Sequence, residues 1–137
     1  MTVLLDAYAL IAYLRDEPAA PIVQRLLWDG QLAMSWVQLA EVVDRMERVY
    51  GVATDEFEVA VSALGIEVVV ADYPVGARAG RLRARHYGST GRTLSLADSF
   101  CAATAVIGKM TVATADPILF TVAESEGCQI LRRPGSA

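Results

Sequence analysis

Short runs of apolar and β-branched residues alternate along the chain with longer stretches in which apolar positions recur every three to four residues. The short runs predict strands, and the longer stretches, with their helical period or uniform apolarity, predict packed helices. The predicted strands span residues 2–5, 32–34, 66–70, 111–114 and 129–131. The predicted helices span residues 7–14, 20–28, 36–50, 55–64, 75–87, 96–108 and 117–126.

This order of strands and helices predicts an α/β fold in which a mostly parallel, five-stranded sheet is covered by helices on both faces. The expected helix starts carry matching residues. Ser35 with Gln38 and Ser95 with Asp98 form capping-box patterns, and Asp116 precedes a proline suited to a first helical turn. In open parallel sheets, ligands bind beyond the carboxyl ends of the strands, so we expect a functional crevice at that edge.

The composition indicates one compact domain. The 137 residues are 54% hydrophobic and 20% charged, which provides apolar material for a core. No repeat or linker divides the sequence, so we expect a single domain over residues 1–131 and a short tail over 132–137. Neither a long apolar run nor a leader pattern is visible. We therefore expect a cytoplasmic protein without a membrane segment, in which Cys101 and Cys128 are reduced.

Charge is distributed unevenly along the chain. The formal net charge of -4 argues against a general nucleic-acid binder, because such proteins carry a surplus of Lys and Arg. One segment nevertheless gathers His86 with Arg78, Arg81, Arg83, Arg85 and Arg92. Arg78, Arg81 and Arg85 share one face of a predicted helix, where guanidinium groups can bind the phosphates of RNA. An ordinary solvated helix face explains the same pattern equally well.

Single acidic residues interrupt apolar sequence at four places. Asp6 follows the first predicted strand, and Asp116 follows the fourth. Asp98 is the only charged residue within 93–108, and Glu41 lies in an apolar stretch two turns into its helix. A charge in such surroundings needs a partner, a cap, a metal ion or water. Because the α/β order brings strand ends and helix starts to one edge, we expect the four carboxylates to converge there.

Each acid also has a structural explanation. Asp6 and Asp116 can be helix N-caps, Asp98 can be the acidic member of its capping box, and Glu41 can face solvent. Convergence favours function, because crowded carboxylates repel each other and hard cations such as Mg²⁺ or Mn²⁺ prefer oxygen ligands. Such ions promote phosphodiester hydrolysis. The single histidine, the absence of zinc-ligand spacing and the absence of a glycine-rich phosphate loop disfavour other chemistries.

Four short motifs, in order over nearly the whole chain, resemble those of a PIN domain. They are Val3-Leu4-Leu5-Asp6-Ala7-Tyr8-Ala9-Leu10, Leu39-Ala40-Glu41-Val42, Leu96-Ala97-Asp98-Ser99 and Thr114-Ala115-Asp116. In its length and in the residues of these motifs, the chain is most similar to VapC-type toxins of bacterial toxin–antitoxin systems. The resemblance implies a three-layer sandwich and a metal-dependent endoribonuclease that binds Mg²⁺ or Mn²⁺ and cuts RNA. It also implies a homodimer and a cognate antitoxin whose C-terminal segment covers the active site.

By position, the resemblance assigns the metal and the catalysis to Asp6, Glu41, Asp98 and Asp116, with Thr114 as a supporting hydroxyl. The sequence departs from the family pattern at two positions. Tyr8 stands where a small Ser or Thr is common, which puts hydroxyl support of the metal there in doubt. Pro117 stands where a polar residue is usual and stiffens the start of the last helix. Neither change removes an acid.

Other protein classes use related residues. A catalytically silent PIN-like domain would bind RNA or a partner protein, and only activity measurements separate it from a nuclease. A phosphoacceptor receiver domain requires paired acids after the first strand and a lysine after a late strand, whereas Asp6 stands alone and Lys109 precedes its strand. A haloacid-dehalogenase-like phosphatase requires a second Asp at the position of Tyr8.

Overall fold

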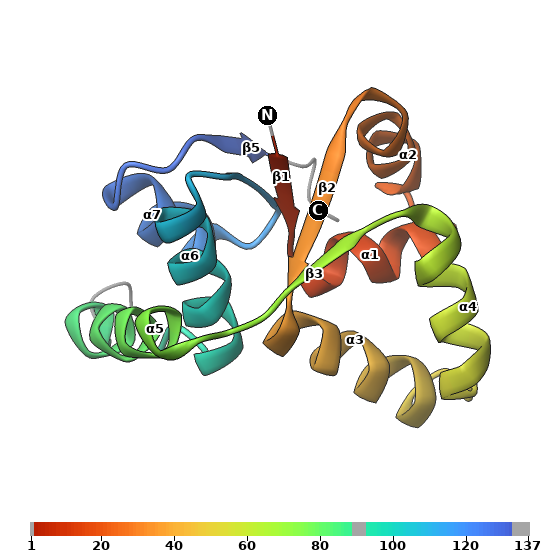
Figure 1. Ribbon diagram of the computed structural model, residues 1–137, viewed down its shortest axis with the longest axis horizontal. Helices are drawn as coiled ribbons and strands as arrows, with labels where there is room; N and C mark the ends of the chain where they lie inside the picture. Colours follow the sequence, from red (N-terminus) through yellow and green to blue (C-terminus); the bar gives the residue numbers. More distant parts are fainter. Residues whose placement is uncertain (1, 89–92, 133–137) are drawn as a thin grey trace.

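The computed structural model describes residues 2–88 and 93–132, and the predicted α/β class is confirmed. In chain order, the elements are β1 (Thr2–Leu5), α1 (Ala7–Leu14), α2 (Ala20–Asp29), β2 (Gln31–Ser35), α3 (Trp36–Arg48), α4 (Thr54–Leu64), β3 (Glu67–Val69), α5 (Tyr73–His86), α6 (Leu96–Gly108), β4 (Thr111–Thr114), α7 (Pro117–Ser125) and β5 (Ile130–Arg132). Every predicted strand and helix has a counterpart among them (Figure 1).

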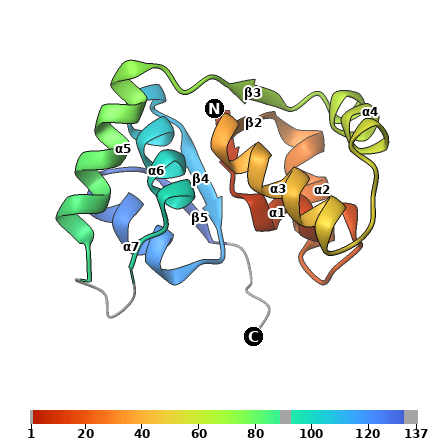
Figure 2. The same ribbon diagram turned by 90° about the horizontal axis from the view of Figure 1, so that it is seen from below.

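The strands form one sheet in the order β3-β2-β1-β4-β5, and all pairings among the described strands are parallel. Alternate residues of each strand face opposite layers. In β1, Val3 and Leu5 pack in the core shared with α1 to α4, whereas Leu4 packs in the core shared with α5, α6 and α7. Figures 1 and 2 show these two groups of helices on opposite sides of the sheet. The predicted cover of helices on both faces is therefore confirmed.

The predicted boundaries differ from the observed ones by up to two residues, and local hydrogen bonds explain the larger shifts. Helix α5 begins early, at Tyr73, because Asp72 Oδ1 accepts a hydrogen bond from the Val75 N–H (3.2 Å). Helix α3 ends early because Gly51 adopts a φ of 70° and the Val52 N–H donates to the Met46 carbonyl (2.9 Å). Of the expected tail, residues 133–137 lie outside the described residues.

The carboxyl ends of β1 and β4 form the topological switch point of the sheet. After β1 the chain passes through α1 and α2 on one face, whereas it reaches β4 through α5 and α6 on the other. Connections that diverge in this way leave a crevice beyond the strand ends. The residues that follow these two strands, Asp6 and Asp116, therefore lie where the sheet topology favours ligand binding.

Two general expectations concern membranes and cysteines. Within the ranges 2–88 and 93–132, no helix is long and apolar enough to cross a membrane. Cys101 is buried and Cys128 is half-buried, and both are free thiols. Burial raises the pKa of both thiols, which keeps them protonated and unreactive.

Candidate active site

Asp6 is placed by the register of the sheet. Leu5 pairs with Ala113 of β4, so Asp6 comes to lie beside Thr114. The Thr114 hydroxyl donates to Asp6 Oδ2 (2.6 Å), and the Ala9 N–H donates to Asp6 Oδ1 (2.8 Å) at the start of α1. Asp6 is 1% exposed. Asp6 is therefore the N-cap of α1, as its position in the sequence allowed, and hydrogen bonds hold both of its carboxylate oxygens in place.

Thr114 also connects Asp6 to Asp116. Its hydroxyl oxygen accepts a hydrogen bond from the Asp116 N–H (3.0 Å) while it donates to Asp6. Asp116 Oδ1 in turn accepts from the N–H groups of Ile118 (2.8 Å) and Leu119 (3.1 Å), which caps α7. The hydroxyl that was predicted to support the site thus contacts the residues at the ends of both central strands.

Asp98 reaches the same edge from the first turn of α6, and Glu41 reaches it from the second turn of α3. The Ser95 hydroxyl accepts a hydrogen bond from the Asp98 N–H (3.0 Å), as the capping pattern predicts. The Asp98 carboxylate, however, turns toward α3, where its Oδ1 accepts from Gln38 Nε2 (3.0 Å). Glu41 lies one turn after Gln38 and is half-buried, so it is not simply a solvent-facing residue.

Glu41, Asp98 and Asp116 line one cavity of about 230 Å³. The remainder of its wall is formed by Tyr8, Thr93, Leu94, Ser95 and Ile118. Asp6 is not part of this wall, but its charge raises the pKa of both Glu41 and Asp98. The structure therefore brings three of the four predicted acids to one cavity and places the fourth within electrostatic reach.

The acids oppose each other's ionisation. Burial raises the pKa of Glu41, the charges of Asp98 and Asp6 raise it further, and Arg45 counteracts them. Burial likewise raises the pKa of Asp98; the hydrogen bond from Gln38 lowers it, and the charges of Asp116 and Asp6 raise it. A site that disfavours the charged form of its own carboxylates is one in which a bound cation is stabilised.

The acids that line the cavity form no ion pair with any described side chain. Among the side chains that the structure describes, Glu41, Asp98 and Asp116 have no Lys, Arg or His nitrogen within 4.0 Å. Within 2–88 and 93–132, no group of three or more His, Cys, Asp or Glu is arranged so that it could hold a metal ion. The site is therefore a cluster of acids around a cavity, and not a preformed cage of ligands.

Sequence reasoning missed two residues of α3 that lie beside the acids, Gln38 and Arg45. They follow the spacing i, i+3, i+7 with Glu41, so all three share one helix face. Arg45 lies 5.5 Å from the centre of the Tyr8 ring, and its buried Nε has no hydrogen-bond partner. The helical spacing was the signal for both. The Ser35–Gln38 capping pattern correctly marked the start of α3, where the Gln38 N–H donates to the Ser35 hydroxyl, but it does not indicate that the Gln38 side chain bonds to Ala7 and Asp98.

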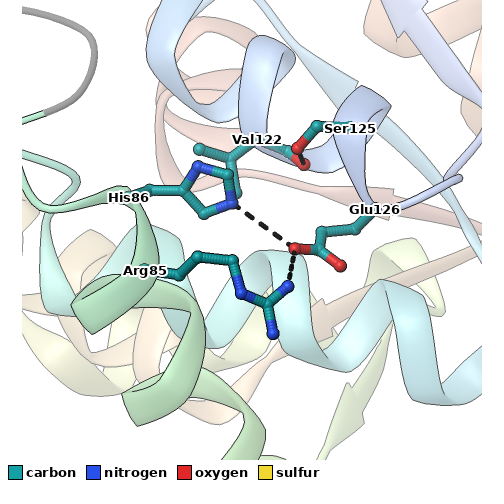
Figure 3. A network of polar contacts seen from close by, with 5 residues as sticks. All are labelled: Arg85, His86, Val122, Ser125 and Glu126. Carbon is teal, nitrogen blue, oxygen red and sulfur yellow. Dashed lines mark hydrogen bonds and ion pairs between the residues drawn. The ribbon is translucent and has the colours of Figure 1, made fainter.

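The basic segment on α5 has partners within the fold. Arg85 Nη1 forms an ion pair with Glu126 Oε1 (2.7 Å), and His86 Nε2 lies 3.4 Å from the same oxygen. Figure 3 shows both side chains reaching Glu126 at the end of α7. Arg83 Nε donates to the Leu94 carbonyl (3.1 Å). Of the predicted phosphate-binding face, Arg81 is exposed and Arg78 half-exposed, while Arg92 of the same segment lies outside the described residues.

Comparisons with known proteins agree with this geometry. No curated protein matches the sequence. Among solved structures, FitAcB from Neisseria gonorrhoeae is 25% identical, with 94% of this chain and 96% of that chain covered and a TM-score of 0.64. A DNA-bound VapBC from Salmonella typhimurium is 18% identical, with coverages of 96% and 98% and a TM-score of 0.72. VapC20 of Mycobacterium tuberculosis, a toxin that cleaves the sarcin-ricin loop, is 16% identical, with coverages of 96% and 99% and a TM-score of 0.70.

The family comparison covers most of the chain. The sequence matches the PIN domain family over residues 3–125, a range that contains all four acids and extends from β1 to the end of α7. The chain belongs to the PIN domain family.

Proposed function

We propose that this chain is the toxin of a toxin–antitoxin pair and acts as an endoribonuclease that hydrolyses RNA phosphodiesters with Mg²⁺ or Mn²⁺. The observation that carries the proposal is the cavity at the switch point, which Glu41, Asp98 and Asp116 line without a described cation at ion-pair distance. Membership of the PIN domain family supports it. So does the similarity in fold to VapC20, a toxin that cleaves the sarcin-ricin loop.

The donor set fits a hard divalent cation in its chemistry. Its groups are carboxylate oxygens, which Mg²⁺ and Mn²⁺ prefer as ligands. The pKa values of Glu41 and Asp98 are raised, and a bound cation would stabilise the ionised form of both carboxylates. Mg²⁺ keeps several waters and binds through one or two carboxylates plus substrate phosphates, so it does not require a preformed cage. Asp98, Asp116 and Glu41 would hold the ion. When bound, it supplies Lewis-acid stabilisation of the phosphate and a water of lowered pKa.

The other side chains of the site orient these groups and the substrate. Thr114 keeps the Asp6 carboxylate from rotating by donating to it, and the same oxygen fixes the backbone of Asp116. Tyr8 lines the cavity, and burial together with the Glu41 charge raises the pKa of its phenol. Tyr8 therefore stays protonated at neutral pH and can donate a hydrogen bond to a phosphate oxygen. The exposed guanidinium of Arg81 can attract the RNA backbone.

An apolar groove supports a protein partner. It is formed by α3 and α4 and is lined by Trp36, Val37, Leu39, Ala40, Val43, Asp44, Thr54 and Glu58. Trp36 is 53% exposed and adds a large aromatic surface to the groove. A solved structure whose fold this chain shares, from Klebsiella pneumoniae, is a toxin–antitoxin complex. We propose that this groove belongs to the surface covered by the antitoxin, and that the chain also forms a homodimer.

The nuclease proposal is tested with the purified chain and single-stranded RNA in Mg²⁺ or Mn²⁺. Cleavage should stop on chelation, and Asp98→Asn and Asp116→Asn should each reduce the rate by at least about 100-fold, as expected for groups that act on the transition state. Asp44→Asn is the matched control, because Asp44 is an exposed α3 acid that pairs with Arg48 (3.0 Å). Metal-independent cleavage, or full cleavage by both variants, would contradict the mechanism. Correctly folded wild type without cleavage would favour the silent, binding-only alternative.

The toxin proposal is tested in cells. Expression of the chain alone should arrest growth, the Asp98→Asn variant should not, and co-expression of a partner encoded beside it should restore growth. Because an Arg from the partner can pair with the acids in place of the cation, Mn²⁺ should compete with the partner for the wild-type chain. Unimpaired growth during expression of an RNA-cleaving chain, with no partner present, would reject the toxin assignment and leave the nuclease assignment intact.

A further inference from the structure

Gln38 is a buried polar residue whose amide is hydrogen-bonded at both ends. Its Oε1 accepts from the Ala7 N–H (2.6 Å), and its Nε2 donates to the Ala97 carbonyl (3.1 Å) and to Asp98 Oδ1 (3.0 Å). Its backbone N–H donates to the Ser35 hydroxyl (3.1 Å). Gln38 is 0% exposed, so water cannot replace these partners. The amide is therefore held in a single orientation, with its NH₂ group toward Asp98.

The partners of Gln38 belong to segments that each carry an acid. Ala7 directly follows Asp6, and its N–H is one of the donors that the first turn of α1 leaves without an intrahelical acceptor. Asp98 is bonded directly, at the start of α6. Glu41 lies on the same face of α3, one turn after Gln38. The Gln38 side-chain amide thus connects α1, α3 and α6 close to the acidic residue that each segment carries.

Thr114 provides the complementary connection. It links Asp6 to the residue after β4, Asp116, through one hydroxyl. Gln38 links the start of α1 to Asp98 and, through α3, to Glu41. Two neutral side chains therefore hold Asp6, Asp98 and Asp116 through hydrogen bonds to these residues or to their neighbours, and neither adds a charge to the cluster.

We propose that Gln38 is a positioning residue of the nuclease site, which fixes the Asp98 carboxylate and the spacing of α1, α3 and α6 for cation binding. The proposal rests on the proposed function. Residues that orient metal-binding carboxylates are commonly worth 10- to 100-fold in metal affinity or activity. A buried side chain does not touch RNA, so its loss should lower kcat and cation affinity while KM for RNA stays unchanged. A purely structural amide would lower stability alone.

The test compares Gln38→Met, which keeps the length of the side chain without its hydrogen bonds, with the wild type in the full-length chain. Calorimetric titration should show Mn²⁺ binding weakened by about 10- to 100-fold, and kcat should fall by a similar factor with KM unchanged. Val61→Ala is the control, because it removes core volume from α4 without touching an acid. If Gln38→Met binds Mn²⁺ and cleaves as the wild type does, or if Val61→Ala reproduces its losses, the proposal is wrong.

A second measurement needs no variant of Gln38. In NMR spectra of the wild type without metal, the Gln38 side-chain NH₂ should exchange slowly with water, and its resonances should shift in Asp98→Asn. Rapid exchange with no shift would overturn the proposal even if Gln38→Met does not fold. Failure of the proposed function would look different: the wild type would neither cleave RNA nor bind Mn²⁺, while the Gln38 amide would still report its bond to Asp98.

Discussion

The two edges of the sheet differ in whether their acidic side chains form ion pairs. At the amino edge, near the start of β4, Glu126 lies 2.7 Å from Arg85 and 3.4 Å from His86, so its charge has partners (Figure 3). At the carboxyl edge, Glu41 and Asp98 share a cavity with no described cation within 4.0 Å, and both have raised pKa values.

This difference separates paired charges, which stabilise the fold, from unpaired acids, for which we propose a bound cation. Folding favours pairing, and the amino edge follows that tendency by joining α5 to α7. The carboxyl edge keeps its acids crowded at a cost in stability, although the same chain contains many arginines. Perturbed carboxylates in a cavity at a topological switch point are typical of a functional site.

The largest expected effect on stability comes from removing the hydroxyl that links the two central strand ends. Thr114→Val should lower RNA cleavage by about 10- to 100-fold, because Asp6 and Asp116 lose their common partner. It should also lower the free energy of unfolding by about 1–3 kcal/mol, since a buried Asp6 oxygen loses its donor. Thr104→Val is the control, because that hydroxyl donates only within α6, to the Phe100 carbonyl (2.7 Å). Equal cleavage by both variants would contradict the role of Thr114.

At the same edge, Asp98→Asn should stabilise the fold while it abolishes activity. The folded-state pKa of Asp98 is raised, so ionisation of this group destabilises the folded state above that pKa. Asn removes the charge and keeps an oxygen that can accept from Gln38. We expect a gain of about 0.5–2 kcal/mol at neutral pH in urea unfolding. The gain should shrink as the pH falls through the raised pKa, because the wild-type carboxyl then takes up a proton. A loss of stability at neutral pH would contradict the account.

At the opposite edge, removal of an acid should lower the stability of the fold instead of raising it. Glu126→Gln removes the acid that joins Arg85 and His86, so the free energy of unfolding should fall. The loss should stay below about 1 kcal/mol, because the Arg85 side chain is 60% exposed and solvent screens the pair. High salt should reduce the difference between variant and wild type. A stabilising Glu126→Gln would remove the contrast between the two edges.

The smallest effect concerns RNA attraction by α5. Arg78→Gln with Arg81→Gln should weaken RNA binding and reduce the slope of log affinity against log salt by about 1.4, if each guanidinium neutralises one phosphate of a single strand. The cleavage rate at saturating RNA should stay unchanged. Arg25→Gln, on an exposed part of α2, serves as the control for general charge loss. An unchanged salt slope would make this face of α5 an ordinary solvated surface.

The sequence predicted those features that depend on order along the chain. The alternation of apolar runs determines the elements and their layers, and residues that directly follow β1 and β4 must lie at the carboxyl edge. Side-chain direction across the edge was not predictable in the same way. The Gln38 amide and Arg85 could each follow a local pattern, but the packing of α3 against α6 directs Gln38 to Asp98, and the packing of α6 against both α5 and α7 brings Arg85 to Glu126. Helical periodicity specifies which residues share a face of a helix, and tertiary packing determines which residues contact that face.

The most direct test of the cation site is the effect of Mn²⁺ on thermal unfolding of the wild type and of Asp98→Asn. A cation that binds only the folded state raises the unfolding temperature with its concentration. Without Mn²⁺, the variant should unfold at a higher temperature than the wild type, because it lacks the repulsion at the cavity. With increasing Mn²⁺, the unfolding temperature of the wild type should rise and that of the variant should stay nearly constant. The difference between the two temperatures should therefore shrink or change sign. An unresponsive wild type, or an equal response of both proteins, would contradict a cation site in the carboxylate cavity.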